Sequence, residues 1–417
     1  ETDVIKSITL LPGVNTIGEG AAGFNVRGGR IDLNLVLYDG VQLFNSQHIL
    51  GFFSIFNPDL LSDFELYKGA IPARYGGRAS SVLSINNKSG NKDGINFTGT
   101  FGTVSTKLAV DGPITDKLTF STGLRFTYSD WILNQVNDLD IQNSSAGFYD
   151  FNARLDYLIN ESNRVSLSYF QSFDEFQFTD DFGFDWSNQF LKLGWDSNIS
   201  SRVTSQFSAS ISEYESTLFD FEVEKSARVD NGVDNWQVNQ NFLIEYDKHE
   251  INAGIEVVNN NSKQETRVPI NNSSIEPDFA PKDQGREYAL YVDDVFEVSP
   301  KLTLNAGLRY TLYHNLGPAN VFLYEDQPVN SPIVDTLFYE DQEVIETYTG
   351  LSPRLSAKYN LGKNNSVKAA YNRMYQFIHL ISNTAAPTPV DIWQVSNTYI
   401  EPIVSNNYSV GFFQNFD

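Results

Sequence analysis

The sequence contains no cysteine and only one methionine, Met374, among its 417 residues. The missing cysteines exclude disulfide bonds, thiolate catalysis and zinc sites built on cysteine. No run of about 18 apolar residues occurs, so we expect no transmembrane helix. Because the chain does not begin with methionine, we expect it to be a processed or shortened product.

Charged residues are also scarce, at 19% of the chain, and only 29 lysines and arginines stand against 52 acidic residues. The resulting net charge of −23 argues against nucleic acid as a partner, because nucleic-acid binders carry basic stripes. Aromatic residues, by contrast, make up 14% of the chain. Together with abundant glycine, asparagine and serine, this composition predicts a large, mainly β protein.

Motifs for catalysis and cofactor binding are missing as well. Neither G-x-S-x-G nor H-E-x-x-H occurs, and the four histidines are scattered. Residues 18–23, GEGAAG, match G-x-G-x-x-G, but an alternating segment follows where a dinucleotide site requires a helix. We therefore expect no enzyme, no cofactor and no metal site, and we interpret these glycines as part of a loop.

Residues 95–417 alternate repeatedly between apolar and polar side chains. In residues 117–128, for example, the apolar side chains share one face and most polar side chains share the other. We count about fourteen such segments, several of them long enough to cross a bilayer as tilted strands. With the apolar face toward lipid, the polar face would line a lumen that is either an open channel or a plugged one.

The connections between these segments alternate in length. Short ones, such as residues 160–162 and 247–248, take turns with long ones, such as 129–148 and 314–349. This rhythm is typical of an outer-membrane β-barrel, whereas a large soluble β-sandwich or lectin does not explain it. Aromatic residues close to the long loops predict an aromatic girdle: Tyr128, Phe151, Phe170, Tyr310, Tyr313 and Tyr375.

The first 94 residues differ from the rest, with short β-like runs broken by glycine-rich turns, which predicts a small α+β domain inside the barrel. Four of its segments are distinctive: LPGV (11–14), FNVRGG (24–29), LVLYDGVQL (35–43) and FELYKGAIPARYGGRASSVLSI (64–85). In this order and spacing they closely resemble the plug of TonB-dependent outer-membrane transporters, and the variant KGAIPARYGG resembles the Bacteroidetes type.

The resemblance implies three parts: a plug at residues 1–88, a linker at 89–94 and a transmembrane antiparallel barrel at 95–417. The family's barrel has roughly 22 strands. Because our count is about fourteen and the usual N-terminal TonB box is missing, we expect the chain to be shortened at both ends.

The resemblance also implies a function. TonB, driven by the proton-motive force, would pull on the plug so that a scarce ligand bound from outside passes the outer membrane. The ligand class stays open between siderophore, vitamin, glycan and peptide. Implied partners are TonB with its inner-membrane motor, outer-membrane lipids and, for this type of receptor, a lipoprotein. Two alternatives are kept, namely a passive channel with an N-terminal hatch and a β-rich surface adhesin or lectin.

By the same resemblance, three plug loops point outward, at about residues 15–23, 44–52 and 74–79. The ligand-binding candidates are side chains of two of these loops and aromatic residues of the barrel loops: Asn45, Gln47, His48, Arg74, Tyr75, Trp131, Trp186 and Trp393. Tyr313 and Tyr399 are further loop aromatics suited to stacking on a ligand. We expect plug–barrel ion pairs at Arg27, Glu65 and Arg78, because a charge inside a lumen needs a partner.

Overall fold

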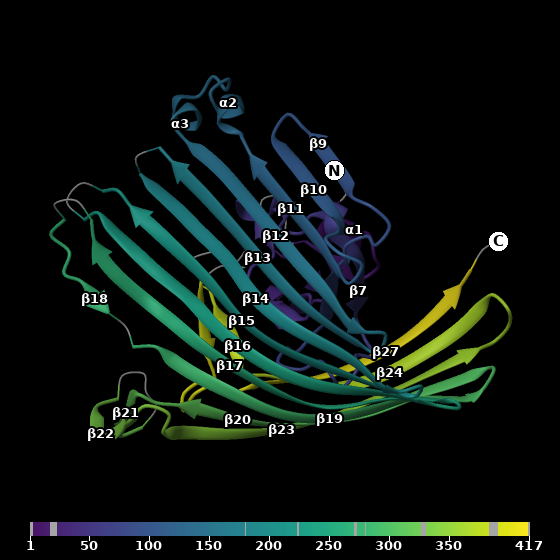
Figure 1. Cartoon of the computed structure of the whole chain (residues 1–417). Helices are drawn as coiled ribbons and strands as arrows, with labels where there is room; N and C mark the ends of the chain where they lie inside the picture. The colour runs from purple at the N-terminus through teal and green to yellow at the C-terminus, as the bar shows by residue number, and fades with distance from the viewer. Residues whose placement is uncertain are drawn as a thin grey trace.

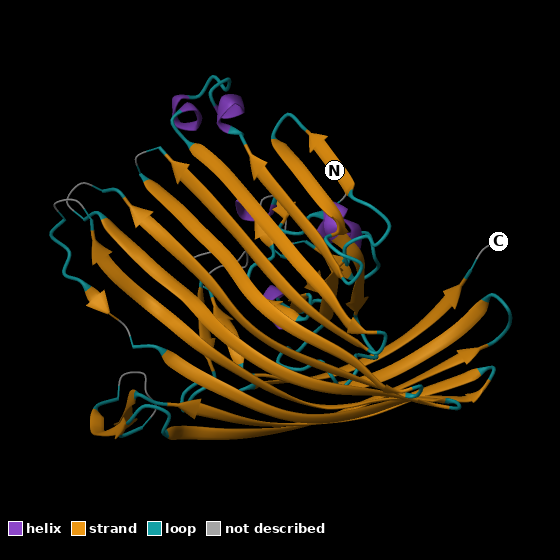
Figure 2. Ribbon diagram, in the orientation of Figure 1, coloured by secondary structure: helices purple, strands orange, loops and turns teal. Residues whose placement is uncertain are grey.

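The computed structural model describes residues 3–16, 23–179, 181–222, 225–270, 273–279, 281–326, 331–382 and 391–415. Most of them form one large antiparallel sheet that curves around a small N-terminal domain (Figure 1, Figure 2). The predicted mainly β architecture, a curved wall with an enclosed domain, is thus confirmed. No helix among the described residues is long and apolar enough to span a membrane.

The strands of the large sheet follow one another in chain order from edge to edge, and each coincides with one of the segments predicted from alternation. They are β9 (Asn96–Phe101), β10 (Ser105–Pro113), β11 (Leu118–Thr127), β12 (Ser145–Asn160), β13 (Asn163–Phe178), β14 (Phe182–Ser200), β15 (Val203–Asp220), β16 (Ala227–Tyr246), β17 (His249–Pro269), β19 (Asp283–Ser299), β20 (Leu302–Leu316), β23 (Val344–Asn360), β24 (Asn365–Gln376) and β27 (Ile403–Gln414). A short strand, β18 (Asp278–Phe279), pairs beside β17. Within the described residues, the edge strands β9 and β27 each have a single neighbour.

In this sheet the apolar side chains face outward and the polar side chains face inward, which is the reverse of the arrangement in a soluble protein. On β14, Leu191, Leu193 and Trp195 point away from the enclosed domain and are 41%, 44% and 47% exposed. On β11, the alternate polar side chains, such as Ser121 and Arg125, are buried against that domain. An apolar outer belt and a polar interior are the pattern of a membrane-spanning barrel wall.

Several strands extend further on the long-loop side than the alternation predicts. β17, for example, runs over 21 residues to Pro269, whereas its alternating segment ends near Asn260. Beyond Val257, its outer face carries Asn259, Asn261 and Lys263 in place of apolar residues. These outer positions are polar and bonded to the neighbouring strand, as Asn259 is to Arg286 at 2.9 Å, so the period-2 contrast disappears while the strand pairing continues.

Two members of the predicted aromatic girdle are placed wrongly by the sequence prediction. Phe170 is completely buried and packs with Phe190 into the core of the N-terminal domain. Tyr313 is buried as well and stacks on Phe377 at 4.8 Å between ring centroids. Both side chains point inward because the enclosed domain and an inward hairpin supply apolar partners there.

The N-terminal domain is built on a four-stranded sheet with the order β4–β3–β8–β7. The Asp39–Gly40 turn joins β3 to β4, and both residues have positive φ (50° and 79°), as a two-residue hairpin turn requires. The elements of this domain are α1 (Val4–Thr9), β1 (Val14–Asn15), β2 (Asn25–Val26), η1 (Ile31–Leu33), β3 (Leu35–Tyr38), β4 (Val41–Leu43), β5 (Gln47–His48), η2 (Ile49–Gly51), β6 (Phe53–Ser54), η3 (Pro58–Leu60), β7 (Leu61–Tyr67) and β8 (Val82–Asn87).

The core of this domain is not closed by its own residues alone. Tyr38 meets Phe170 of β13 and Phe190 of β14 edge-on, at 5.1 and 5.8 Å between ring centroids. Its hydroxyl donates to Asn152 of β12 at 2.8 Å. The barrel wall therefore completes the plug core, and plug and wall share one packed interface.

Long-loop connections carry the remaining elements. These are α2 (Asp130–Leu133), α3 (Leu139–Gln142), and the hairpins β21–β22 (Ala319–Tyr324, Ile333–Tyr339) and β25–β26 (Ile378–Ile381, Ile392–Val395). The β21–β22 hairpin extends away from the wall (Figure 1). The β25–β26 hairpin instead packs against β16, β17 and β19, and so it covers the plug on the long-loop side.

Candidate functional site

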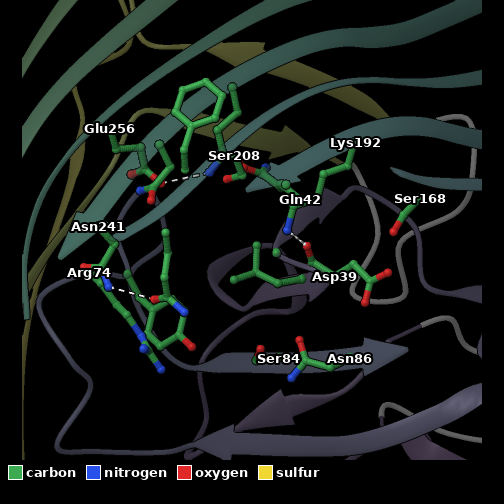
Figure 3. Close-up of a pocket in the computed structure, with 18 of the residues that line it drawn as sticks. Asp39, Gln42, Arg74, Ser84, Asn86, Ser168, Lys192, Ser208, Asn241 and Glu256 are labelled. Carbon is green, nitrogen blue, oxygen red and sulfur yellow. Dashed lines mark hydrogen bonds between the residues drawn. The ribbon is translucent and has the colours of Figure 1, made fainter. Parts of the chain in front are cut away.

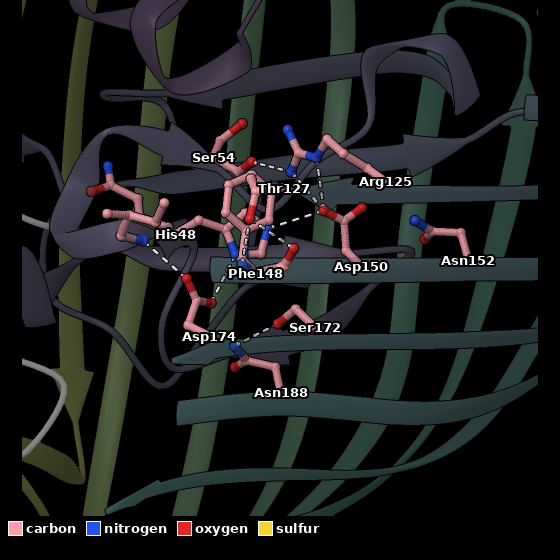
Figure 4. Close-up of polar contacts among 12 residues, drawn as sticks. His48, Ser54, Arg125, Thr127, Phe148, Asp150, Asn152, Ser172, Asp174 and Asn188 are labelled. Carbon is pink, nitrogen blue, oxygen red and sulfur yellow. Dashed lines mark hydrogen bonds and ion pairs between the residues drawn. The ribbon is translucent and has the colours of Figure 1, made fainter. Parts of the chain in front are cut away.

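A buried charged cluster joins the plug to the wall at β11, β12 and β13 (Figure 4). The His48 ring lies between two carboxylates, with Nδ1 at 2.7 Å from Asp174 and Nε2 at 3.0 Å from Asp150. Asp174 also accepts a hydrogen bond from the backbone N–H of Ile49 at 2.9 Å. The ring stacks on Phe148 with centroids 3.9 Å apart, so both its edges and one of its faces are occupied.

Arg125 completes this cluster from the neighbouring strand β11. Its Nε donates to Asp150 at 2.8 Å, and its Nη2 donates to the carbonyl oxygen of Ser54 in the plug at 2.6 Å. His48, Asp150, Asp174 and Arg125 are each at most 1% exposed. With His48 protonated, two cations balance two anions, and the cluster carries no net charge.

The protonation of His48 depends on this environment. Burial by itself lowers the pKa of His48, but attraction by Asp174 and hydrogen bonds to Asp150 and Asp174 outweigh it. The net result is a pKa above the usual 6.5. The protonated ring is thus the form that the two carboxylates stabilise.

Further polar contacts hold the plug at other points of the wall. Lys192 of β14 donates to the carbonyl oxygen of Asp39, and Arg154 of β12 lies 3.6 Å from the Asp39 carboxylate. On the opposite side, Arg354 of β23 donates to the carbonyl oxygens of Ile71 and Tyr75 at 3.1 and 3.0 Å. The plug is therefore tied to strands on both sides of the lumen.

A small cavity of about 60 Å³ lies on the long-loop side of the plug, beneath the β25–β26 hairpin. We call it the loop-side cavity. The Arg78 guanidinium lies in it, 5.0 Å from the Trp393 ring centroid and 5.8 Å from that of Phe44. Burial lowers the pKa of Arg78 to about 10, partly offset by Asp32 and Glu287. A cation framed by aromatic faces suits an anionic or aromatic ligand group, but the hairpin closes this volume.

Hydrogen bonds hold the hairpin down. Gln376, at the end of β24, donates to the carbonyl oxygen of Ile378 at 2.8 Å, and Gln264 of β17 donates to Gln394 at 2.7 Å. His379 contacts the Ser396 hydroxyl at 2.8 Å. Burial, together with repulsion from Arg78, lowers the pKa of His379 to about 4, so this ring is neutral near pH 7. The hairpin thus covers the plug and is held there by polar contacts that water can replace.

A second cavity, of about 570 Å³, lies on the short-turn side of the plug, against the inner face of β12–β19 (Figure 3). We call it the inner cavity. Asp39, Gln42 and Ser84 of the plug face Ser168, Lys192 and Ser208 of the wall across it. Its volume is in the range of small-molecule sites. Within the described residues, no group of three or more acidic or histidine side chains is placed to hold a metal ion.

The structure separates the predicted plug-loop ligand contacts. Asn45 lines the loop-side cavity. Gln47 is buried, where it accepts a hydrogen bond from the backbone N–H of Gly23 at 2.7 Å. His48 is fully buried in the charged cluster, so the expected outward position is wrong for it. Arg74 and Tyr75 line the inner cavity instead of an outward-facing loop, because Arg354 and Arg309 hold their backbone against the wall.

The predicted barrel aromatics divide in the same way. Trp186 and Trp393 are buried in one cluster with Tyr214 beside the loop-side cavity. Trp131 lies on α2, is 52% exposed and donates to the carbonyl oxygen of Thr103 at 3.1 Å, apart from this cluster. Tyr399 is 48% exposed and donates to the carbonyl oxygen of Phe322 at 2.6 Å. Most of the predicted loop at 15–23 lies outside the described residues, namely at 17–22.

The plug–barrel ion pairs in the structure are not the ones expected at Arg27, Glu65 and Arg78. Arg27 and Glu65 are exposed, and neither forms an ion pair within the described part of the chain; Glu65 accepts from the hydroxyl of Tyr67. Arg78 is buried and attracted by Asp32 and Glu287, without a close pair to either among those residues. The pairing role instead falls to Arg125, Asp150, Asp174 and His48. The first three occupy lumen-facing positions of strands whose side chains alternate between apolar and polar. This pattern predicts that their charges point inward, but it does not predict which residue each of them pairs with.

Comparisons with known proteins agree with this geometry. A family model described as "TonB dependent receptor-like, beta-barrel" matches residues 135–416, and one described as "TonB-dependent Receptor Plug Domain" matches residues 1–83. A plug enclosed by a polar-lined wall defines a class, the plugged outer-membrane receptors. The chain belongs to the TonB-dependent receptor family, which confirms the resemblance to that family and the outer-membrane location.

Solved structures share the fold at low sequence identity. The copper transporter OprC matches with a TM-score of 0.71 and 11% identity, over 100% of this chain and 67% of that one. The alcaligin receptor FauA from Bordetella pertussis matches with 0.67 and 13%, over 99% and 64%. The open form of the ferric-catecholate import receptor Fiu from E. coli K12 matches with 0.66 and 15%, over 90% and 67%. The chain spans about two thirds of their lengths. Among curated protein sequences, none matches this chain.

Proposed function

We propose that this chain forms the plug and the adjoining wall of an energy-coupled uptake receptor. A scarce ligand binds from outside above the plug, and TonB, driven by the proton-motive force, then displaces the plug from the periplasmic side. Siderophore, vitamin, glycan and peptide remain the ligand classes considered, with a lipoprotein as a further partner. Family membership and the enclosed plug support this proposal.

The buried cluster around His48 is the observation that carries the proposal. Breaking a buried ion pair costs about 3–5 kcal/mol. A ligand shifts an equilibrium only by its differential affinity for the two states. The cluster lies below the loop side and is buried, so a ligand bound from outside cannot contact it. Breaking the cluster therefore requires an external energy source, and this is the role that we assign to TonB.

On the outer side, we propose the loop-side cavity as the ligand site once the β25–β26 hairpin has lifted. Arg78 would donate hydrogen bonds to ligand oxygens, and Phe44 and Tyr214 would provide stacking faces. Asn45 would add a hydrogen bond at the rim. Arg78→Ala should then weaken ligand capture at the cell surface without lowering the amount of receptor in the membrane.

A reversible disulfide between plug and wall tests the energy-coupled opening. A Cβ built on Gly69 would lie 3.6 Å from the Cβ of Ser409 on β27, within the 3.5–4.5 Å typical of disulfides. The chain has no cysteine, so the pair Gly69→Cys and Ser409→Cys forms the sole disulfide in it. Mass spectrometry of the growth medium should show compounds depleted by cells with the receptor, no depletion with the locked receptor, and recovery after dithiothreitol.

Each single-cysteine variant serves as the matched control and should behave as the original receptor does. A proton uncoupler should also stop the depletion. Depletion that continues with the uncoupler contradicts energy coupling and identifies a passive hatch channel. Absence of depletion in every strain contradicts uptake and leaves the surface adhesin.

A further inference from the structure

The inner cavity is lined chiefly by uncharged polar side chains. Thirteen serine, asparagine and glutamine residues border it, compared with nine charged ones, so hydrogen bonding dominates its chemistry. Two tyrosines, Tyr75 and Tyr291, also face it. Hydroxyl and amide groups both donate and accept hydrogen bonds, and they can therefore match ligands that carry many hydroxyl groups.

The charges around this cavity are nearly balanced and largely occupied. Four cationic and five anionic side chains border it, so it has no field of a single sign that would attract a multiply charged ligand. Arg164 pairs with Asp196 at 2.7 Å, and Lys192 donates to the Asp39 carbonyl oxygen. Glu256 pairs with Arg309. Anion sites, by contrast, gather unpaired arginines around the ligand.

A line of small hydroxyl side chains connects this cavity with the loop-side cavity along β15. Tyr214 lines the loop-side cavity, and Ser208 lines the inner cavity. Ser210 and Ser212 lie between them on the same face, because side chains alternate along a strand. The two cavities are thus about 20 Å apart along one strand, at a rise of about 3.3 Å per residue.

The plug element that separates the two cavities is β4, an edge strand that packs against β14 and β15. Gln42 of β4 is 9% exposed and borders the inner cavity, and its side-chain nitrogen has no hydrogen-bond partner among the residues that the structure describes. The hydroxyl of Ser212 on the facing strand has none either. Unpaired buried polar groups are costly, so both groups are available to bond a solute that enters here.

We infer that the inner cavity is a second, transit-side binding site for an uncharged, polyhydroxylated solute such as a short oligosaccharide. The solute reaches it from the loop side along the serines of β15 when β4 moves. Gln42 and the amide groups of the wall bind hydroxyls, while Tyr75 and Tyr291 cover the apolar ring faces. This inference rests on the proposed uptake function and names its ligand class.

Cysteine protection in the purified receptor tests this site, with maltotriose as the probe. The chain has no native cysteine, so Ser208→Cys provides a single reactive thiol in the inner cavity. We expect millimolar maltotriose to slow its labelling by a small methanethiosulfonate reagent at least about threefold, because a site of this size is largely filled by such a ligand. Equal concentrations of citrate or phosphate should leave the rate unchanged.

Ala209→Cys is the matched control, since it lies one position further along β15 on the opposite, outer face. Maltotriose should not change its labelling rate. Unprotected Ser208→Cys, or protection by citrate equal to that by maltotriose, overturns the inference. The assay requires neither TonB nor transport, so it fails or succeeds independently of the disulfide-lock experiment.

Discussion

The plug meets the wall in two different ways. At β11–β13 the contact is dry and charged, with His48, Asp150 and Arg125 all buried and bonded to one another. Towards the short-turn ends of β12–β19 the contact leaves a cavity of about 570 Å³ bordered by serine and amide side chains. The loop side of the wall therefore holds the plug, and the short-turn side leaves room for a solute, so retention and passage are assigned to different levels of the same wall.

The largest expected effect comes from breaking the charged side. Arg125→Met leaves Asp150 buried with His48 as its remaining ionic partner, and it removes the bond to the Ser54 carbonyl oxygen. We expect the free energy of local opening of residues 42–56 to fall by about 3–5 kcal/mol. Hydrogen exchange followed by mass spectrometry measures it.

The control is Lys225→Met, whose pair with Glu222 is about two thirds exposed and should contribute almost nothing. An opening free energy unchanged by Arg125→Met would show that the charged side does not hold the plug.

A smaller effect should follow from titrating His48, since the ring stays in place. Its folded pKa lies above the unfolded value of 6.5 because of Asp174 and Asp150. Its contribution is therefore complete below pH 6.5 and is lost as the pH rises through the folded pKa. Local opening of residues 42–56 should become easier at alkaline pH. The same measurement on His48→Gln should show no such dependence; an identical pH profile would contradict the role of this ring.

On the open side, Lys192→Met should cost less than Arg125→Met. It removes one hydrogen bond to the Asp39 carbonyl oxygen, and water in the inner cavity can replace that donor. We expect a loss of about 1 kcal/mol in the chemical unfolding of the plug. Lys248→Met, at an exposed short turn, is the control. A loss as large as that of Arg125→Met would remove the distinction between the two sides.

The smallest effect is expected for Ser212→Ala. This substitution deletes a buried hydroxyl without a partner in the described part of the chain, so stability should change by less than about 0.5 kcal/mol. Ser216→Ala, four residues further on, deletes a hydroxyl that donates to Asn231 at 2.8 Å and should cost about 1 kcal/mol. Equal costs for the two would mean that Ser212 has a structural partner at rest.

Much of the fold could be predicted from the sequence, because a wall with one face toward lipid and one toward the lumen requires apolar and polar residues to alternate along each strand. The apolar Leu191 and Leu193 and the polar Lys192 between them identify β14 directly. The prediction was wrong where an inward side chain is apolar: Phe170 breaks the rule because the plug core receives it. It was also short at the loop-side ends of strands such as β17, where polar residues on both faces remove the pattern.

The candidate site was harder to predict from the sequence than the fold was. Trp186, Trp393 and Asn45 do gather at the loop-side cavity, whereas Arg74 and Tyr75 face the other cavity. Whether any of them binds a ligand stays a prediction. The charged cluster was missed because its members come from four strands and are separated by up to 126 positions.

By itself, the sequence determined the class of protein: alternation, loop lengths and the plug segments fix a plugged membrane wall. Only the tertiary structure decided which charges pair and that the plug leaves a cavity along β15. It also decided that His48 binds the plug to the wall inside a buried cluster, instead of lying at the tip of a loop. The physical reason is that alternation depends on each side chain's contact with lipid or lumen, a local property. Pairing and cavities depend on which distant residues the closed packing of plug and wall brings together.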